Sequence, residues 1–342
     1  MKRILCTLLL VSLLLSGCAS GEEAPQMKQY TASFLDVFDT VTSIVGKAEN
    51  EEIFRTKTQE IHDALMEYHQ LVDIYHNYAG IANLKTINDN AGIAPVKVDS
   101  RILELLKDCR NYYGLTHGMV NPAMGSVLKL WHIARNDGIN NPANAYLPKQ
   151  DALVAAAGHM DFSAVVLDEA ESTVYISDPD VQLDVGAVAK GWSVQRVAEN
   201  APAGLLISVG GNVCATGPKD ENGTAWVVGV QDPNGGDSYL HTLTVTKGSV
   251  VTSGDYQRAY IVDGEIYHHI IDPATLYPSQ LWRSVTIVCD DSGLADALST
   301  ALFVLPLEEG KSLISQCSAE AMWVDRAGET FYSPGFQDYI RT

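Results

Sequence analysis

Basic residues are scarce in this sequence. Its 342 residues include 23 Lys and Arg against 42 Asp and Glu, which gives a formal net charge of −19 at pH 7. Proteins that bind nucleic acid neutralise phosphates with an excess of Lys and Arg, so this composition argues against a nucleic-acid partner. It also means that a phosphorylated ligand would need a metal ion or local N–H donors to offset repulsion.

Several common site motifs are missing as well. No cysteine pair has CxxC or zinc-ligand spacing, and the apolar surroundings of Cys109, Cys214, Cys289 and Cys317 predict buried thiols without thiol chemistry. No GxSxG sequence surrounds Ser253, which argues against a serine hydrolase. The sequence contains no internal repeat and no low-complexity segment.

The apolar run at the N-terminus, residues 4–15, is too short to span a bilayer. It follows Lys2-Arg3 and ends in Leu15-Ser16-Gly17-Cys18, a pattern like a bacterial lipobox. We therefore expect a lipoprotein signal peptide over 1–17, a lipid on Cys18, a tether over 18–30 and one domain over 31–342. Such a protein would be anchored to the cell membrane on its extracytoplasmic face. A plain signal peptide with an incidental cysteine is the alternative.

Helix patterns dominate the first half of the chain and short strand patterns the second. Helical spacing of apolar residues runs over 49–78, 102–113 and around 127–131, after a strand pattern over 34–45 that Asp39-Thr40 interrupts. Strands are expected within 164–185 and at 205–209, 213–215, 226–230, 240–245 and 285–289, with helices over 187–200 and from Ser292. The predicted class is α+β, a helix-rich N-terminal half packed on mainly antiparallel sheets.

A hairpin pattern within residues 250–278 brings histidines and acids together. Asp263-Gly264 lies between two strand patterns and predicts a type I′ turn. The returning strand is expected to carry His268 and His269 and to continue to Pro273, with Asp255 and Asp272 on either side of the histidines in the sequence. Adjacent strand residues point to opposite faces, so only one histidine can face a given site. A surface hairpin with solvated His and Asp is the other interpretation.

Two further stretches suggest a site for an anion and a metal ion. A strand pattern runs into a glycine-rich helix start over 183–191, where free backbone N–H groups, the helix dipole and Lys190 favour an anion, although a simple packing junction has the same pattern. Asp296 and Thr300 are spaced i, i+4 on the last predicted helix, so their oxygens share one face and suit Mg²⁺ or Ca²⁺, with Ser299 as a further donor. A polar stripe on a surface helix is the alternative.

Six segments together carry a resemblance to a known family. They are FDT (38–40), LDVGAVAKG (183–191), SVGGN (208–212), TSGDY (252–256), YHHIIDP (267–273) and ADALSTALFVL (295–305). In this order they resemble the ApbE family, the FAD:protein FMN transferases. The resemblance implies an ApbE-like (T-fold-like) domain that binds FAD and Mg²⁺, and an exported lipoprotein. Such enzymes cleave the FAD pyrophosphate, release AMP and join FMN to a Thr or Ser hydroxyl of a partner protein. The acceptor would carry a motif like S-G-A-T, as redox-pump subunits do.

The resemblance also implies roles for single residues. His269 would be the catalytic base, with Asp255 or Asp272 orienting its ring. The residues expected to contact FAD are Phe38, Tyr75 (with Tyr78 as competitor), Met119, Val120, Asn121, Asp184, Lys190 and Ile271; those expected on the metal are the Ala187 carbonyl, Asp296 and Thr300.

Two positions depart from the family pattern. Asn121 stands where Asp is usual, and Leu276 where Gly is usual, which leaves the turn after Pro273 open. Two other functions fit parts of the sequence. An FAD pyrophosphatase or flavin-binding lipoprotein would use the same site without transfer, and a non-enzymatic solute-binding lipoprotein would fit the leader and the acidic composition alone.

Overall fold

The computed structural model describes residues 26–236 and 238–341. The expected signal peptide, Cys18 and most of the expected tether lie outside the described residues. The first strand already begins at Lys28, within the segment expected to be tether. Within the described ranges, no helix combines the length and the apolar character that a membrane crossing requires.

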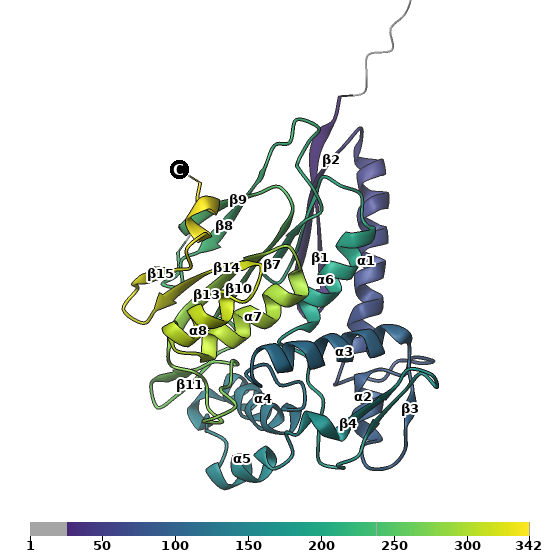
Figure 1. The fold of residues 1–342 in the computed structure, drawn as a ribbon, viewed down its shortest axis with the longest axis vertical. Helices are drawn as coiled ribbons and strands as arrows, with labels where there is room; N and C mark the ends of the chain where they lie inside the picture. Colours follow the sequence, from purple (N-terminus) through teal and green to yellow (C-terminus); the bar gives the residue numbers. More distant parts are fainter. Residues whose placement is uncertain (1–25, 237, 342) are drawn as a thin grey trace, which may run out of the picture.

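An eight-stranded antiparallel sheet forms the centre of the molecule (Figure 1). Its spatial order is β1 (Lys28–Val37), β2 (Thr40–Ala48), β6 (Leu205–Val209), β7 (Asn212–Ala215), β10 (Gly248–Gly254), β13 (Trp282–Cys289), β14 (Ala319–Asp325) and β15 (Thr330–Tyr332). Each neighbouring pair in this order is antiparallel. Three neighbouring pairs, β2–β6, β7–β10 and β10–β13, are not consecutive in sequence, and the last two place β10 between β7 and β13.

Alternation along these strands divides the core into two layers. On one face, Val251 and Ile287 pack with the helices α6 (Ala189–Asn200), α7 (Ser292–Val304) and, at the sheet edge, α1 (Glu51–Val72). On the other face, Val250 and Val288 pack under the hairpin of β8 (Trp226–Gln231) and β9 (Tyr239–Val245). The helix α8 (Leu307–Ile314) follows α7 and also contacts β14.

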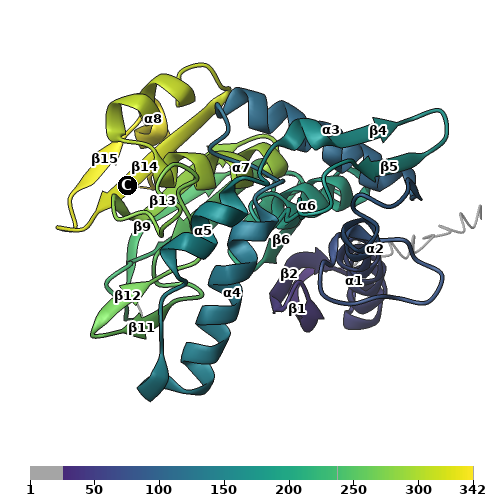
Figure 2. The same ribbon diagram turned by 90° about the horizontal axis from the view of Figure 1, so that it is seen from below.

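A second group of elements lies below the sheet in Figure 1. It contains α2 (Leu84–Asp89), α3 (Ser100–Leu115), α4 (Gly125–Asn140), α5 (Gln150–Ala157) and a small sheet of β3 (Val96–Lys97), β5 (Thr173–Ile176) and β4 (Val165–Asp168). The hairpin of β11 (Tyr260–Val262) and β12 (Glu265–Tyr267) packs beside α4 (Figure 2). Three single-turn 3₁₀ helices complete the fold at Pro142–Asn144, Phe162–Ala164 and Phe336–Tyr339.

The α+β class with mainly antiparallel sheets is confirmed, as is the turn at Asp263-Gly264, where both residues have positive φ (51° and 87°). Three boundaries were wrong. β12 ends at Tyr267, so the strand expected to carry both histidines stops just before them. α1 stops at Val72 and not at Tyr78, because the carboxylate of Asp73 accepts hydrogen bonds from the next loop's N–H groups. The strand expected over 181–185 is an irregular segment, paired only by the bridge between Gln182 and Met124.

Candidate functional site

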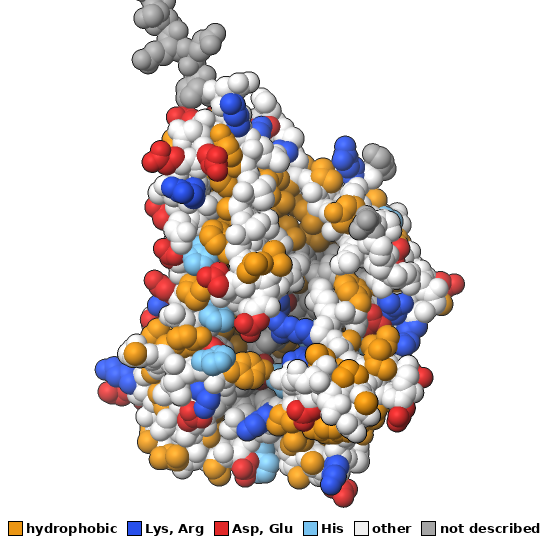
Figure 3. Space-filling model, turned by 180° about the vertical axis from the view of Figure 1, so that it is seen from behind, with side chains coloured by type: hydrophobic (Ala, Val, Ile, Leu, Met, Phe, Trp, Pro, Cys, Tyr) orange, Lys and Arg blue, Asp and Glu red, His pale blue; other side chains and the backbone are white. Residues whose placement is uncertain are grey.

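A cavity of about 580 Å³ opens between the central sheet and the lower group of elements. Its walls come from the β1–β2 turn, the loop after α1, the segment before α4, the start of α6, β10, the segment after β12 and α7. Figure 3 shows a hollow in the rear face, with Lys or Arg side chains at its rim and histidines beside it. The volume lies within the range of small-molecule and cofactor sites.

Most of the residues predicted for the site share this cavity. It is lined by Phe38, Tyr75, Met119, Val120, Asn121, Asp184, Ala187, Lys190, His269, Ile271, Asp296 and Thr300. Tyr78, the competitor of Tyr75, lines it too. Asp255 does not, and Cys18 lies outside the described residues. The segments that carry the separate motifs therefore meet at one cavity. The roles of the individual residues remain predictions.

The predicted metal ligands meet where α6 and α7 approach closely. Gly191 makes this approach possible, because a Cβ atom there would lie 2.2 Å from the Ser292 carbonyl oxygen and 2.6 Å from the Asp296 Cβ. The Gly191 N–H instead donates to Asp296 Oδ2 at 2.8 Å, and Lys190 Nζ lies 3.8 Å from the same oxygen. Among the described residues, only Oδ2 of Asp296 has a partner, which leaves Oδ1 available in the cavity wall.

The Ala187 carbonyl is available to bind a cation for a related reason. In a regular helix the N–H of Gly191 would bond to the carbonyl four residues earlier, which is that of Ala187. Here that N–H bonds to Asp296, and the Ala187 carbonyl lies just before the helix begins at Ala189. A carboxylate oxygen, a hydroxyl and a backbone carbonyl form an all-oxygen donor set, which fits a hard divalent cation such as Mg²⁺.

Ser299 does not join this set, contrary to the sequence interpretation. Its side chain is fully buried and its hydroxyl donates to the Asp296 carbonyl at 2.9 Å. The Ser253 hydroxyl of β10 is 2.8 Å away. The Ser299 hydroxyl is thus occupied by partners within the protein, and Ser299 does not line the cavity.

The two adjacent histidines face different surroundings, as predicted, although both follow β12 and neither lies within a strand. His268 is buried: Nε2 donates to the Ser279 carbonyl at 2.7 Å, and Nδ1 accepts from the Ile270 N–H at 3.2 Å. Both of its nitrogens are therefore occupied within the protein, and burial lowers its pKa. His268 also packs edge-on against Phe303 of α7.

His269 points into the cavity in a defined tautomer. Its Nδ1 lies 3.2 Å from the Gln257 carbonyl oxygen, which can only accept, so Nδ1 carries the proton and Nε2 has a free lone pair. Burial lowers the pKa of His269 well below its usual value, and the charges of Arg258 and Lys190 lower it further. The ring is thus neutral at neutral pH, the state that a proton acceptor requires.

The expected partner of this ring was wrong. Asp255 is buried, and its Oδ2 lies 2.8 Å from Arg283 Nε. Asp272 accepts hydrogen bonds from the Ala274 N–H and the Thr275 hydroxyl within its own turn. The backbone carbonyl of Gln257 takes the place predicted for an acid, because residues 255–258 fold into a turn that brings this carbonyl to the ring.

The structure also explains both departures from the family pattern. The Asn121 amide donates to the Met160 carbonyl and its Oδ1 accepts from the Ala123 N–H, both at 2.9 Å, so it pins the loop before α4. Leu276 adopts φ = 65°, a left-handed conformation that costs a residue with a Cβ about 1–2 kcal/mol. Its buried side chain and the 2.9 Å bond from Trp131 Nε1 to its carbonyl hold this turn.

Sequence reasoning missed several residues of the cavity wall. Three of them, His132 and Arg135 on α4 and Arg258 after β10, surround the cavity near Tyr75. Tyr75 Oη lies 2.8 Å from His132 Nδ1, and burial raises the pKa of Tyr75 to about 12. The i, i+3 spacing of His132 and Arg135 placed them on one helix face, but no sequence signal indicated what that face meets.

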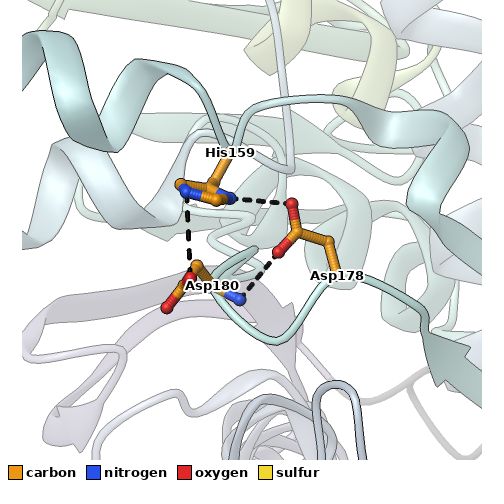
Figure 4. Close-up of side chains that lie close together, drawn as sticks. All are labelled: His159, Asp178 and Asp180. Carbon is orange, nitrogen blue, oxygen red and sulfur yellow. Dashed lines mark hydrogen bonds and ion pairs between the residues drawn. The ribbon is translucent and has the colours of Figure 1, made fainter.

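A separate cluster of His159, Asp178 and Asp180 lies outside the cavity (Figure 4). His159 Nδ1 is 2.7 Å from Asp178 Oδ2 and its Nε2 is 3.8 Å from Asp180 Oδ2, so both nitrogens already face carboxylates. The hydrogen bond with Asp178 raises the pKa of His159. We interpret this cluster as a surface ion pair that fastens the loop after α5.

The sequence and the fold are both similar to those of known proteins. Residues 38–323 match the ApbE family. The FAD:protein FMN transferase of Treponema pallidum is 34% identical over 305 residues, which cover 82% of each chain. That of Klebsiella pneumoniae is 33% identical over 236 residues, or 67% of this chain and 70% of the relative. The crystal structure of the ApbE protein from Thermotoga maritima superposes with a TM-score of 0.81 at 29% identity, over 92% of this chain and all of that one.

Proposed function

This chain belongs to the ApbE family, and we propose that it is an FAD:protein FMN transferase. It would use Mg²⁺ to transfer FMN from FAD to a Thr or Ser hydroxyl of a partner protein and release AMP. The observation that carries this proposal is one cavity in which an all-oxygen cation set and a neutral histidine with a free Nε2 face the same space.

Local positive charge makes this cavity suitable for a pyrophosphate in an otherwise acidic protein. Lys190, Arg135 and Arg258 all line it. Within the described ranges, neither Arg135 nor Arg258 forms an ion pair with a carboxylate, and the charge of Arg258 lowers the pKa of Arg135 in addition to the larger effect of burial. Cations that repel each other in a partly buried site are stabilised by a bound anion.

The residues of the wall divide into holding and reacting groups. Asp296, Thr300 and the Ala187 carbonyl would hold Mg²⁺, which when bound neutralises negative charge on the pyrophosphate oxygens. Lys190 would bind the same phosphates as a point charge. Phe38, Tyr75 and Ile271 would pack against the flat rings, and Met119, Val120, Asn121 and Asp184 would contact the rest of FAD.

Phosphoryl transfer would then proceed by displacement at the FMN phosphorus. The acceptor hydroxyl oxygen forms a new P–O bond, while the bond from this phosphorus to the bridging oxygen breaks and AMP leaves with that oxygen. The proton of the hydroxyl passes to Nε2 of His269, whose ring the Gln257 carbonyl orients through Nδ1. The products are a phosphoester-linked FMN and AMP.

One incubation tests the proposal. Purified protein with FAD, Mg²⁺ and a peptide that contains S-G-A-T should yield AMP and a peptide whose mass increases by one FMN moiety. AMP without the adduct would identify an FAD pyrophosphatase. If neither AMP nor the adduct forms, an enzymatic function is contradicted. A yellow protein would then indicate a flavin-binding lipoprotein, and a colourless one a binding protein for another solute.

We also propose that the protein works outside the cytoplasm, anchored through a lipid on Cys18. The motifs of the N-terminal sequence support this proposal: basic residues, an apolar run and Leu15-Ser16-Gly17-Cys18. The acceptor would then be a membrane-associated or exported protein that presents its hydroxyl at the same membrane face.

A further inference from the structure

Two neighbouring residues of the cavity wall have an unusual backbone conformation. Phe38 and Asp39, which form the turn between β1 and β2, have φ values of 53° and 52°. This left-handed conformation is unfavourable for residues with a Cβ. Such residues keep it only where their surroundings hold them in place, and they cluster at ligand sites. The contacts that hold this turn therefore matter for the cavity.

His69, in the last turns of α1, makes the central contact. The Phe38 N–H donates to His69 Nδ1 at 3.1 Å, and the two rings meet edge-on with their centroids 5.6 Å apart. Because Nδ1 accepts this bond, the proton of the neutral ring must lie on Nε2. Phe38 is only 8% exposed, and a buried backbone N–H without a partner is costly, so this bond stabilises the turn.

The other nitrogen of the imidazole connects His69 to the loop after α1. His69 Nε2 lies 3.4 Å from Tyr78 Oη, which donates to Asp73 Oδ2 at 2.7 Å. Asp73 also accepts from the Tyr75 N–H at 2.6 Å. Burial alone raises the pKa of Asp73, but these hydrogen bonds outweigh it and lower the pKa, so the carboxylate stays charged. Phe38, His69, Asp73, Tyr75 and Tyr78 all line the cavity.

The turn is supported from its far side as well. The Gly210 N–H donates to the Val41 carbonyl at 3.0 Å. A Cβ on Gly210 would lie 2.7 Å from Thr40 Oγ1, so the backbone of the β6–β7 turn lies directly against Thr40. On this side the support comes from the Gly210 backbone, through a hydrogen bond and close packing, whereas His69 supplies a side-chain hydrogen bond.

We propose that His69 is a positioning residue of the FAD site. Its neutral ring holds the strained turn so that Phe38 stays in the cavity wall, and it connects this turn through Tyr78 and Asp73 to the loop that carries Tyr75. The identity of the ligand rests on the proposed function, while the positioning itself can be measured without ligand. A preformed wall binds more tightly because no ordering cost is incurred on binding.

A pair of substitutions separates the two nitrogens of the ring. In His69→Asn the side-chain oxygen lies near the position of Nδ1 and can accept from Phe38, whereas in His69→Gln the amide lies near Nε2 and cannot. Hydrogen exchange of the Phe38 amide in the ligand-free protein reads this bond directly. We expect exchange about tenfold faster in His69→Gln and within about twofold of the parent in His69→Asn, as loss of one hydrogen bond predicts.

Binding and turnover provide the second reading. FAD titrations followed by flavin fluorescence should give a Kd about tenfold higher for His69→Gln and nearly unchanged for His69→Asn. The transfer rate at saturating FAD should stay within about twofold in both variants, because His69 does not contact the reacting atoms. A parent protein that binds no FAD would contradict the proposed function, whatever the exchange data show.

His62→Asn is the matched control. His62 lies two turns earlier on α1, with its Nε2 3.1 Å from Asp36 Oδ1, and it packs against Phe34 of the same hairpin, outside the cavity. This variant should lower the melting temperature but leave Phe38 exchange and the FAD Kd unchanged. Equal effects of His69→Gln and His69→Asn on Phe38 exchange, or an effect of His62→Asn as large as that of His69→Gln, would overturn the proposal.

Discussion

At the scale of single residues, the two adjacent histidines are the sharpest test of the chemistry. His269→Ala removes the free Nε2 that faces the cavity, so FAD should still bind while single-turnover transfer of FMN falls by about 10²–10⁴, the usual loss for a positioned base. Stopped reactions analysed for labelled acceptor give this rate, and flavin fluorescence gives the affinity. Transfer at the parent rate would remove His269 from the mechanism.

His268→Ala serves as its counterpart. Its nitrogens bond to Ser279 and Ile270, so the loss should appear as a lower melting temperature and not as slower chemistry in the folded fraction. A transfer defect equal to that of His269→Ala, at matched folded concentration, would contradict the assignment of His269 as the base.

Asp296 is the second test at this scale. Asp296→Asn keeps an oxygen for the Gly191 N–H but replaces the charged oxygen that faces the cavity. We expect the Mg²⁺ concentration for half-maximal AMP release to rise by about 10²-fold, on the scale of losses at metal sites. An Mg²⁺ titration of AMP release measures this, and an unchanged midpoint would show that Asp296 does not bind the ion.

The role of a residue could be predicted where a sequence motif indicated it. It could not be predicted where the role depends on a contact with a distant part of the chain. The different environments of His268 and His269 were predicted from strand alternation, although both residues follow β12 and lie in no strand. Helical spacing put Asp296 and Thr300 on one face. The hydrogen bond between His269 and the Gln257 carbonyl could not be predicted from the sequence, because every residue type has a backbone oxygen. Asp255 looked suitable by its position, but Arg283, from a strand distant in sequence, pairs with it.

At the scale of elements, the contact between α6 and α7 is the feature that builds the metal site. Gly191→Ala would push a methyl group against the Ser292 carbonyl and force the helices apart. We expect a loss of about 1–3 kcal/mol in the free energy of unfolding, the usual cost of overpacking, and weaker Mg²⁺ dependence. Denaturant unfolding and the Mg²⁺ titration measure the two effects.

Gly114→Ala in α3 is the matched control. No atom lies within 4 Å of a Cβ built at this position. The same substitution should therefore stabilise the protein by up to about 1 kcal/mol through helix propensity. If Gly191→Ala were equally neutral or stabilising, the close approach of the two helices would not be needed.

Elements with strong local signals were predicted well and those that depend on neighbours were not. The strands at 205–209 and 240–245 and the helix from Ser292 appear in the structure with small shifts at most. The end of α1 was missed because Tyr75 and Tyr78 continue the apolar spacing, while the Asp73 carboxylate ends the helix. Sheet order, with β10 between β7 and β13, had no local signal at all.

At the scale of the whole molecule, the lipid anchor that we propose on Cys18 would decide where the enzyme works. Cys18→Ala should shift the protein from the membrane fraction to the soluble fraction, or leave its signal peptide uncleaved, because the acylated thiol is the only attachment that we propose. Fractionation and mass spectrometry of the mature N-terminus check this. Processing and fractionation identical to the parent would contradict the lipobox interpretation.

The cavity wall joins parts of the chain that are far apart, from the turn at Phe38 to Thr300 on α7. No fragment that ends before α7 can therefore contain the complete site, and the binding-competent form appears only when folding is finished. Ligand then acts on the native state alone and stabilises the entire domain, by about 2.7 kcal/mol at a concentration one hundred times Kd. The supply of FAD in the compartment where the chain folds would thus help to set how long this protein survives proteolysis there.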